Sequence, residues 1–405
     1  MWCIPVGTVF RGISVESSLA WLLHPVGVDT FLDEIWATTH HHIQRRRPGY
    51  FDRLLPGPSA VDVLLEHVQP DASTVRMVKS GEDRDPATYR RTYGGLDSVR
   101  VRDGLASGYT IVVNGVERYL RTIASLSHSI EVELNFPTRV NAYVTPPEST
   151  GFVPHYDPHD VLVLQIEGFK TWHVSDAAAV PPHEIQRRKG IGTDGFTPST
   201  DVNLQPGDVL YLPRGQVHSA ETCSEPSVHL TIGLHAPTVL TLLTHELHAL
   251  SLRDPRMHAR LSPRHLDDAT ARAGLGALVR DSLQSLGDPE ILTESLDALA
   301  DVLVRRGRCP PVGRVSDTVG INGLTLVAKY EPLYARVARV DDRVVLQFAR
   351  LSVAAGADHE AAMLFLAGST EPFQVGELPA LNAAQQVGLA KTLILNGFLV
   401  RLSKG

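Results

Sequence analysis

Residues 155–160 read HYDPHD and lie between two apolar runs with the pattern of β-strands. In an extended strand, side chains two positions apart point to the same face. We therefore expect His155 and Asp157 to converge, with Tyr156 pointing away. One further imidazole would complete a set of two histidines and one carboxylate. Such a set suits Fe(II), because it leaves one face of the octahedron open for a bidentate keto acid and O2.

The further imidazole is predicted to be His218, the last residue of PGDVLYLPRGQVH, residues 206–218. Residues 206–208 are expected to turn, 209–212 to form a strand and 213–215 to turn again, which returns the chain to the first motif. A lone His-x-Asp pair is common by chance, and its aspartate is more often a turn acceptor than a ligand. Its coincidence with a turn-strand-turn-histidine element predicts a metal site.

Other histidines are not expected to bind this metal. His159 lies past Pro158, which should bend the strand away. His229 lies within the apolar run SVHLTIG and is predicted to be a barrel-lining residue with its hydrogen bonds satisfied. No turn supports His173 or His183 as a ligand. The three consecutive histidines His40–His42 are predicted to lie in a solvated segment that leads into a strand.

A keto acid such as 2-oxoglutarate carries a second carboxylate, which needs a cation deeper in the site. Burying that carboxylate unpaired would cost several kcal/mol, so such sites supply a lysine or arginine together with a hydroxyl. Lys170 fits, because Glu167 and Gly168 resemble a hairpin turn that places it on the strand next to the metal motif. Alternatively, Lys170 faces solvent. Arg139 and Arg214 would then be the next candidates for the cation that pairs with the carboxylate.

The stretch from about residue 105 to 236 is predicted to be an all-β core. Short runs of about four to eight residues, bounded by Gly, Pro, Asn and Asp, are typical of a β-sandwich or barrel. The runs are TIVVNGV (110–116), RVNAYVT (139–145), VLVLQIEG (161–168), KTWHVS (170–175), DVLYLP (208–213) and SVHLTIGL (227–234).

Helical periodicity appears on both sides of this core. Residues 28–41 are predicted to form a helix capped by Asp29, with Phe31, Leu32, Ile35 and Trp36 on one face. Residues 271–286 and a helix beginning at Asp288-Pro289 carry two apolar stripes. These stripes need a partner surface, either the chain's own barrel or a second copy. They are Leu275, Leu278, Val279, Leu283 and Leu286 in the first helix, and Leu292, Leu296, Leu299 and Leu303 in the second.

Composition is that of an ordinary globular protein. The chain has 405 residues, 43% hydrophobic and 20% charged, which suggests about two or three domains. Its formal net charge of −7 argues against a protein whose main role is to bind polyanions. The three cysteines, Cys3, Cys223 and Cys309, show no metal-ligand spacing and favour a reducing compartment. Neither a signal peptide nor a membrane span is expected, so we predict a cytoplasmic protein.

Residues 141–172, NAYVTPPESTGFVPHYDPHDVLVLQIEGFKTW, resemble the JmjC-type ribosomal oxygenases, a cupin-fold group of protein hydroxylases. The likeness extends to GYTIVVNGV (108–116), YLPRGQVHSAET (211–222) and SVHLTIG (227–233), and more weakly to residues 31–51. The sequence departs from the family at Pro158-His159-Asp160, and residues 175–203 show no likeness. The substrate is therefore less well indicated than the chemistry.

The resemblance implies an α+β fold, in which a double-stranded β-helix (cupin/JmjC) barrel precedes a helical dimerisation region and a winged-helix-like domain. The expected boundaries are 1–240, 241–310 and 311–405, with a linker at CPPVGRV (309–315). It also implies a role for each matched residue. The iron ligands fall on His155, Asp157 and His218, the basic 2-oxoglutarate-binding residue on Lys170, and further co-substrate contacts on Asn141, Tyr143 and Thr231.

The function implied is an Fe(II)- and 2-oxoglutarate-dependent dioxygenase that uses O2 to hydroxylate a side chain in a protein or peptide, with ribosomal proteins as candidates. It would be a homodimer. A free amino acid or another small metabolite is the alternative substrate. A non-oxygenase cupin would more often carry three or four histidines, so Asp157 argues against it. A DNA-binding regulator is disfavoured, because residues 311–405 contain nine Lys/Arg and eight Asp/Glu, a net of +1.

Overall fold

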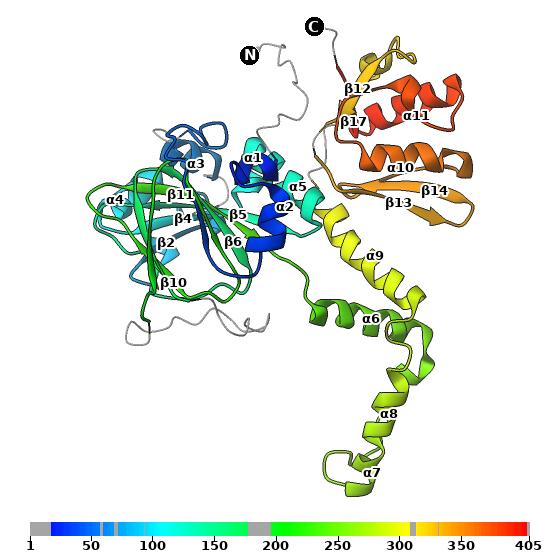
Figure 1. Ribbon diagram of the computed structural model, residues 1–405, viewed down its shortest axis with the longest axis horizontal. Coiled ribbons are helices and arrows are strands. Elements are labelled where there is room, and N and C mark those ends of the chain that lie inside the picture. Colours follow the sequence, from blue (N-terminus) through cyan, green and yellow to red (C-terminus); the bar gives the residue numbers. More distant parts are fainter. Residues whose placement is uncertain are drawn as a thin grey trace.

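The computed structural model describes residues 18–56, 60–68, 72–92, 94–176, 196–307, 313–330 and 332–402. Figure 1 shows a β-rich body, a group of helices that leads away from it, and a smaller unit of helices and strands near the C-terminus. The short strands predicted between residues 105 and 236 belong to the first body, and the predicted linker at 309–315 lies partly outside the described residues.

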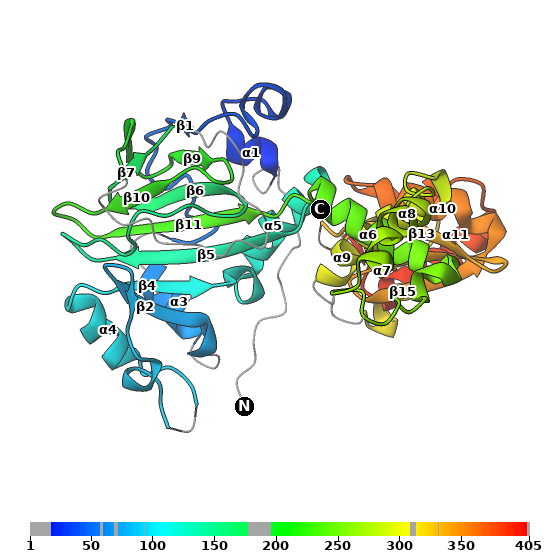
Figure 2. The ribbon, with the colours of Figure 1, turned by 90° about the horizontal axis from the view of Figure 1, so that it is seen from below.

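Two antiparallel sheets face each other in the first body. The larger has the order β1-β9-β6-β11-β5-β4-β2-β3 and the smaller β10-β7-β8, and Figure 2 shows the central strands of the larger sheet side by side. The predicted sandwich or barrel is confirmed. The strands are β1 (His41–Ile43), β2 (Val75–Lys79), β3 (Glu82–Asp83), β4 (Thr110–Asn114), β5 (Thr138–Thr145), β6 (Asp160–Glu167), β7 (Lys170–Val174), β8 (Thr200–Leu204), β9 (Val209–Leu212), β10 (His218–Glu221) and β11 (Ser227–Leu234).

Both faces of the larger sheet are buried, which explains the continuous apolar run of β6. Val161 and Val163 pack between the two sheets with Trp172 of β7. Leu162 and Leu164 point the other way, into a core shared with helices. A strand covered on both faces needs apolar residues at every position. The helices of this body are α1 (Leu19–Leu23), α2 (Val28–Thr30), α3 (Ala60–Val68), α4 (Ser98–Ala106) and α5 (Arg121–Leu134).

Helix α5 corrects the prediction that residues 105–236 are all β. It buries Ile123, Leu126 and Ile130 against the larger sheet, at helical spacing. Three of its other buried positions are polar (Ser127, His128 and Glu131), and they hid this periodicity in the sequence. Glu131 accepts hydrogen bonds from the backbone N–H and the hydroxyl of Thr138, at 2.9 and 3.2 Å.

The predicted helix over 28–41 is also corrected. Helix α2 continues as a π-helical turn over Phe31–Ile35 and the helix ends there. Ala37 adopts a φ of 58°, which a helix does not allow. Asp29 is not the cap, because Gly27 occupies that position without a side-chain bond. Of the predicted apolar face, Phe31 is buried and Leu32 is exposed.

The segment after this helix is not simply solvated, as the sequence suggested for His40–His42. Strand β1 pairs with β9, and His42 Nε2 lies 3.1 Å from Asp208 Oδ2. The buried Asp208 carboxylate also accepts the backbone N–H groups of Arg45 and Arg46, at 2.7 and 2.8 Å. Burial alone would raise the pKa of Asp208, but these hydrogen bonds hold it below its usual value. The first predicted turn is thereby tied to the N-terminal segment.

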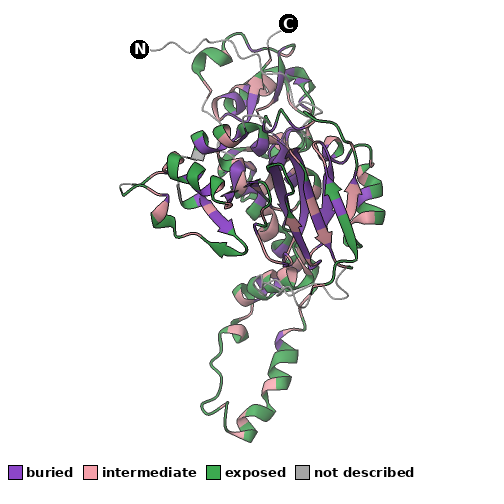
Figure 3. Cartoon of the chain, turned by 90° about the vertical axis from the view of Figure 1, so that its left-hand side faces the viewer, coloured by how far each residue is buried: buried purple, intermediate pink, exposed green. Residues whose placement is uncertain are grey.

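The helical region comprises α6 (Val239–Arg253), α7 (Ala269–Ala273), α8 (Leu275–Ser282) and α9 (Pro289–Arg306). Helix α9 begins at Pro289 as predicted, although Asp288 makes no side-chain cap bond. The helix expected over 271–286 is divided at Gly274 and ends at Ser282. Helices α7 and α8 project from the rest of the molecule with mostly exposed side chains (Figures 1 and 3). Arg306 at the end of α9 pairs with Glu131 at 2.7 Å, which joins the helices to the barrel.

The C-terminal unit mixes short strands with helices, as the sequence predicted. Its sheets have the orders β16-β12-β17 and β13-β14-β15 and share one apolar core with its helices. A winged-helix identity for this unit remains a prediction. Within the described residues, no helix is both long and apolar enough to cross a membrane. The elements are β12 (Leu326–Lys329), β13 (Ala335–Val340), β14 (Arg343–Phe348), β15 (Leu351–Gly356), α10 (Glu360–Gly368), β16 (Phe373–Gln374), α11 (Ala383–Leu395) and β17 (Leu399–Arg401).

Candidate metal centre

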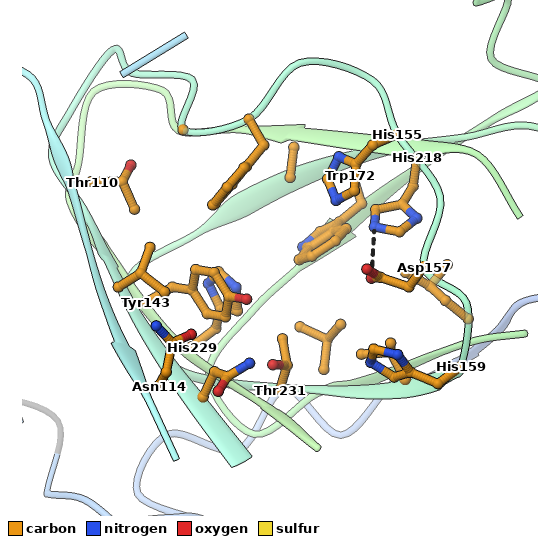
Figure 4. A pocket seen from close by; sticks show the side chains of 18 of the residues that line it. Thr110, Asn114, Tyr143, His155, Asp157, His159, Trp172, His218, His229 and Thr231 are labelled. Atoms are coloured by element: carbon orange, nitrogen blue, oxygen red, sulfur yellow. Dashed lines mark ion pairs between the residues drawn. The ribbon is translucent and has the colours of Figure 1, made fainter. Parts of the chain in front are cut away.

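The two sequence motifs meet between the sheets. One potential ligand atom from each of His155, Asp157 and His218 lies within 4.8 Å of the others, and all three residues are buried. Figure 4 shows the three side chains pointing toward one another. The segment before β6 and the start of β10 are held together by backbone hydrogen bonds between His155 and His218, at 2.8 and 3.0 Å. The predicted convergence of these residues is therefore present.

Both imidazoles present the same nitrogen to the centre. His155 Nδ1 lies 2.8 Å from the Val153 carbonyl oxygen, and His218 Nδ1 lies 3.0 Å from that of Gln216. A carbonyl oxygen only accepts hydrogen bonds, so each Nδ1 carries a proton, and Nε2 is the nitrogen that could bind a metal. His218 Nε2 lies 3.8 Å from Asp157 Oδ2. The donor set is two imidazoles and one carboxylate, and one ion could bind all three.

Turn residues hold this geometry. Gly215 has a φ of 86° and donates its N–H to the Asp157 carbonyl oxygen at 2.9 Å. Glycine adopts that conformation at little cost. The second predicted turn thus contacts the first motif directly, before β10 begins at His218. Strand β10 in turn pairs with β7, which brings His218 opposite Val174.

Lys170 lies in the same cavity, which has a volume of about 340 Å³ and is also lined by the three ligand candidates. Its side chain is buried at 5% exposure, and Nζ donates to Thr145 Oγ1 at 2.9 Å. Among the described residues, no acidic side chain pairs with it. Burial lowers the pKa of Lys170 to about 7. The site therefore holds a cation that lacks an anionic partner.

The path to Lys170 differs from the predicted hairpin. Strands β6 and β7 belong to opposite sheets, so residues 167–168 cross between the sheets instead of joining neighbours. Gly168 has a φ of 65°, and a Cβ there would lie 1.8 Å from the Pro226 carbonyl oxygen. The turn was predicted correctly, but the pairing was wrong. Lys170 points into the cavity from the facing sheet, and the solvent-facing alternative is excluded by its burial.

Residues 118–242 match the JmjC domain family. They form a JmjC domain. The resemblance to the JmjC-type ribosomal oxygenases is confirmed. One relative is the bifunctional lysine-specific demethylase and histidyl-hydroxylase NO66 of Drosophila mojavensis, 27% identical over 366 residues, which covers 80% of this chain and 39% of the relative. The NO66 of Aedes aegypti is 27% identical over 320 residues, 72% of this chain and 48% of the relative. The chain thus spans less than half the length of these relatives.

Solved structures show the same fold over nearly the whole chain. The X-ray structure of Escherichia coli ycfD has a TM-score of 0.60 at 18% identity and covers 93% of this chain and 98% of that one. A structure described as E. coli ribosomal oxygenase YcfD in complex with cobalt and 2-oxoglutarate has a TM-score of 0.55 at 16% identity, with 94% and 99% covered. At this identity, the likeness concerns the fold alone.

The three other residues that were predicted to contact the co-substrate all line the metal cavity: Asn141, Tyr143 and Thr231. Asn141 Oδ1 already accepts the backbone N–H of Gly115 at 3.1 Å, which fixes its orientation. Of the two alternative cations, Arg139 lines this cavity and Arg214 does not. Thr145 was not predicted, although a hydroxyl beside the cation was expected. Its place at the end of the strand that contains Asn141 and Tyr143 is the signal that identifies it.

Two other histidines of the JmjC domain differ from expectation. His229 lines the cavity, but its buried Nδ1 has no hydrogen-bond partner among the described residues, so the prediction of a satisfied residue was wrong. Its ring stacks on Tyr143 at 4.7 Å. Burial, with a contribution from Lys170, holds the pKa of His229 well below its usual value. His159 also lines the cavity, stacked on His235 at 4.3 Å, instead of being turned away by Pro158.

The remaining candidates lie elsewhere. His173 pairs with Asp201 at 2.6 Å and with Glu221 at 3.5 Å, on a partly exposed face of the smaller sheet. His183 lies outside the described residues, as does most of the 175–203 loop. Cys223 is exposed and is a free thiol, and the other two cysteines are not among the described residues.

Proposed function

We propose that this chain is an Fe(II)- and 2-oxoglutarate-dependent oxygenase that hydroxylates an amino-acid side chain within a protein or peptide. The observation that supports it is the presence, in one cavity, of a two-histidine, one-carboxylate set and a buried lysine that pairs with no acidic side chain of the described residues. Iron, when bound, would supply the redox chemistry that couples oxidation of 2-oxoglutarate by O2 to hydroxylation of a C–H bond.

The residues fit this metal. His155 Nε2, His218 Nε2 and an Asp157 oxygen would be the protein ligands, and the carboxylate would offset part of the metal's charge. Three protein ligands from one side leave the other face of the ion free for co-substrate and O2. The hydrogen bonds from each Nδ1 to a carbonyl keep both rings in the orientation and tautomer that this role needs.

The residues also fit the co-substrate. Lys170 would bind the distal carboxylate of 2-oxoglutarate. The Thr145 hydroxyl, which accepts a hydrogen bond from Lys170, would be the hydroxyl expected beside the cation. Asn141, Tyr143 and Thr231 would contact the rest of the molecule. Trp172, which lines the cavity, belongs to a buried apolar cluster, and such surroundings would strengthen the ion pair.

A macromolecular substrate is supported by the relatives, which are named histidyl-hydroxylases and lysine-specific demethylases, and by a structural neighbour described as a ribosomal oxygenase. Because the chain spans 39% of the first relative, its own substrate is open to test. The alternative is that the oxygenase hydroxylates a free amino acid or another small metabolite.

Mass spectrometry separates these possibilities. Peptide mixtures, including tiled ribosomal proteins, and metabolite pools are incubated with protein, Fe(II), 2-oxoglutarate and O2, then searched for products heavier by one oxygen atom. We expect such products among the peptides. Products only among metabolites would contradict the proposed substrate class, and no 2-oxoglutarate consumption in either pool would contradict the oxygenase itself.

We further propose that residues 241–310 form a homodimer, that residues 311–405 are a winged-helix-like structural or protein-binding module without direct nucleic-acid contact, and that the protein is cytoplasmic. The dimer is supported by apolar side chains of the helical region that stay exposed in one copy, among them Leu278, Val279 and Leu296. Two copies meeting on these faces would form an isologous contact.

Light scattering tests the dimer. The chain has a mass of 44.2 kDa, so we expect twice that value at micromolar concentration. Leu296 is 51% exposed, and the Leu296→Glu variant should reduce the mass to that of one chain without loss of helicity. A monomeric mass for the unaltered protein would contradict the proposal.

A further inference from the structure

A second cavity of about 690 Å³ lies between the rim of the barrel and the helical region. Its barrel side includes Trp36 and Arg214, and its helical side is formed by Val239 at the start of α6 and by Leu299 and Val302 of α9. We call it the rim groove. It is a place where helices outside the JmjC barrel approach the residues around the metal centre.

The rim groove adjoins the metal cavity. Pro158, His159 and His235 line both of them. The rings of His159 and His235 stack at 4.3 Å with 28° between their planes. A Cβ on Gly233 would lie 2.8 Å from the His159 ring, so the glycine lets His159 pack close to β11. The stacked pair therefore forms the wall where the two cavities join.

We propose that the rim groove binds an extended segment of the substrate polypeptide, whose oxidised side chain reaches the metal centre past His159 and His235. This inference rests on the proposed function and adds the route and the contacts of the substrate. The metal cavity, at about 340 Å³, has room for a co-substrate and one side chain, so a polypeptide needs a further surface. The rim groove provides that surface, and α6 and α9 become part of the substrate site.

Charge indicates which segment fits. Among the described residues that line the groove, Arg214 is the only lysine or arginine and Asp160 the only carboxylate. Asp160 is buried and accepts the Tyr211 hydroxyl at 2.7 Å and the Arg214 N–H at 3.3 Å, so it is not available to a ligand. Without a free carboxylate, the groove disfavours a basic side chain. Trp36, Leu299 and Val302 instead offer an apolar surface, which fits an apolar side chain beside the oxidised residue.

The groove is distinct from the face proposed for dimerisation. Leu299 was predicted to share one stripe with Leu296, but only Leu299 lines the groove, and Leu296 does not. A second copy on the Leu296 face would leave the groove open to substrate. A variant at Val302 and one at Leu296 should therefore change different properties.

The test uses mixtures of short peptides, each with one fixed central residue and randomised flanks. The wild-type protein is first assayed for peptides that gain one oxygen atom. The best peptide is then labelled, and its affinity for metal-free protein is measured by fluorescence anisotropy. Val302→Glu places a charge on the apolar wall at a position 43% exposed, where the fold should tolerate it. Val239→Glu does the same at the first residue of α6, 74% exposed, where a carboxylate suits the helix dipole.

We expect both variants to weaken peptide binding by at least about tenfold, because each would bury a carboxylate against an apolar side chain. Succinate formation without peptide should stay at the wild-type rate. Val340→Glu, at a site 51% exposed in the C-terminal unit, is the matched control and should change neither property. Wild-type affinity in both groove variants would overturn the inference, and so would a change of oligomeric mass at unchanged affinity, which would assign the groove to a second copy. If the wild-type protein oxidises metabolites and no peptide, the proposed substrate class is overturned, and the inference about the groove with it.

Discussion

Replacing Asp157 with alanine is expected to reduce 2-oxoglutarate turnover by more than about 100-fold. Loss of a hydrogen-bonding partner of a metal ligand typically costs about 10–100-fold in metal affinity or activity, and loss of the ligand itself should cost more. Asp157→Ala leaves two imidazoles to hold Fe(II), and removes the one negative charge of the set. Binding of Co(II), measured by titration calorimetry, should weaken in parallel, which gives a readout that does not depend on turnover.

The fold should survive this change. The Asp157 carboxylate contacts His218 Nε2 at 3.8 Å, and its backbone carbonyl, which accepts the Gly215 N–H, is unaffected by the substitution. Asp201→Ala is the matched control: Asp201 is an exposed aspartate of the smaller sheet that pairs with His173. It should retain turnover, and both variants should keep the wild-type circular dichroism spectrum. Full turnover by Asp157→Ala at limiting iron would rule out Asp157 as a ligand.

The metal centre could be predicted because its determinants are local. His155 and Asp157 are two residues apart, and residues 206–218 contain their own turns, so each motif fixes its geometry within a few residues. The strands of the larger sheet were equally visible, since β5, β6 and β11 are runs of apolar and β-branched residues between turn formers.

Pairing between strands could not be predicted in the same way. Gly168 marks a turn in any context, but the sequence does not say whether the next strand joins the same sheet. In the structure, the carbonyl of Pro226, fifty-eight residues later, approaches the glycine so closely that no side chain fits. Helix α5 was missed for a related reason, because Glu131 is buried only through its bonds to Thr138 and Arg306.

His159 shows the same limit at the site. Pro158 suggested locally that the chain bends away from the metal, yet stacking on His235 and the absence of a side chain on Gly233 bring the ring to the cavity wall. Gly233 lies near the end of β11, and His235 directly follows that strand. The substrate side of the centre is therefore built by contacts between distant segments, whereas the metal side is built by short motifs.

Truncating Lys170 to alanine is expected to raise the apparent KM for 2-oxoglutarate. Truncating one partner of a buried, hydrogen-bonded charge pair costs about 2–5 kcal/mol, which corresponds to about 30-fold to a few thousandfold in affinity. Lys170→Met should have a similar effect, because it keeps the apolar stem and removes only the charge. An unchanged KM in both variants would move the carboxylate partner elsewhere, and Arg139, which lines the same cavity, would be tested next.

The pH dependence gives an independent test of the same residue. Burial lowers the pKa of Lys170 to about 7 in the free protein, and a bound carboxylate should raise it again. Below pH 7 the lysine is already charged when 2-oxoglutarate arrives, so affinity should be at its highest. Above pH 7 binding must also take up a proton, and affinity should fall by up to about tenfold for each pH unit until the pKa of the complex is reached. Lys170→Met removes the titrating group, so its weaker binding should lose this dependence on pH. If the wild-type affinity, measured by calorimetry between pH 6 and 9, does not fall, a carboxylate bound by charged Lys170 is excluded.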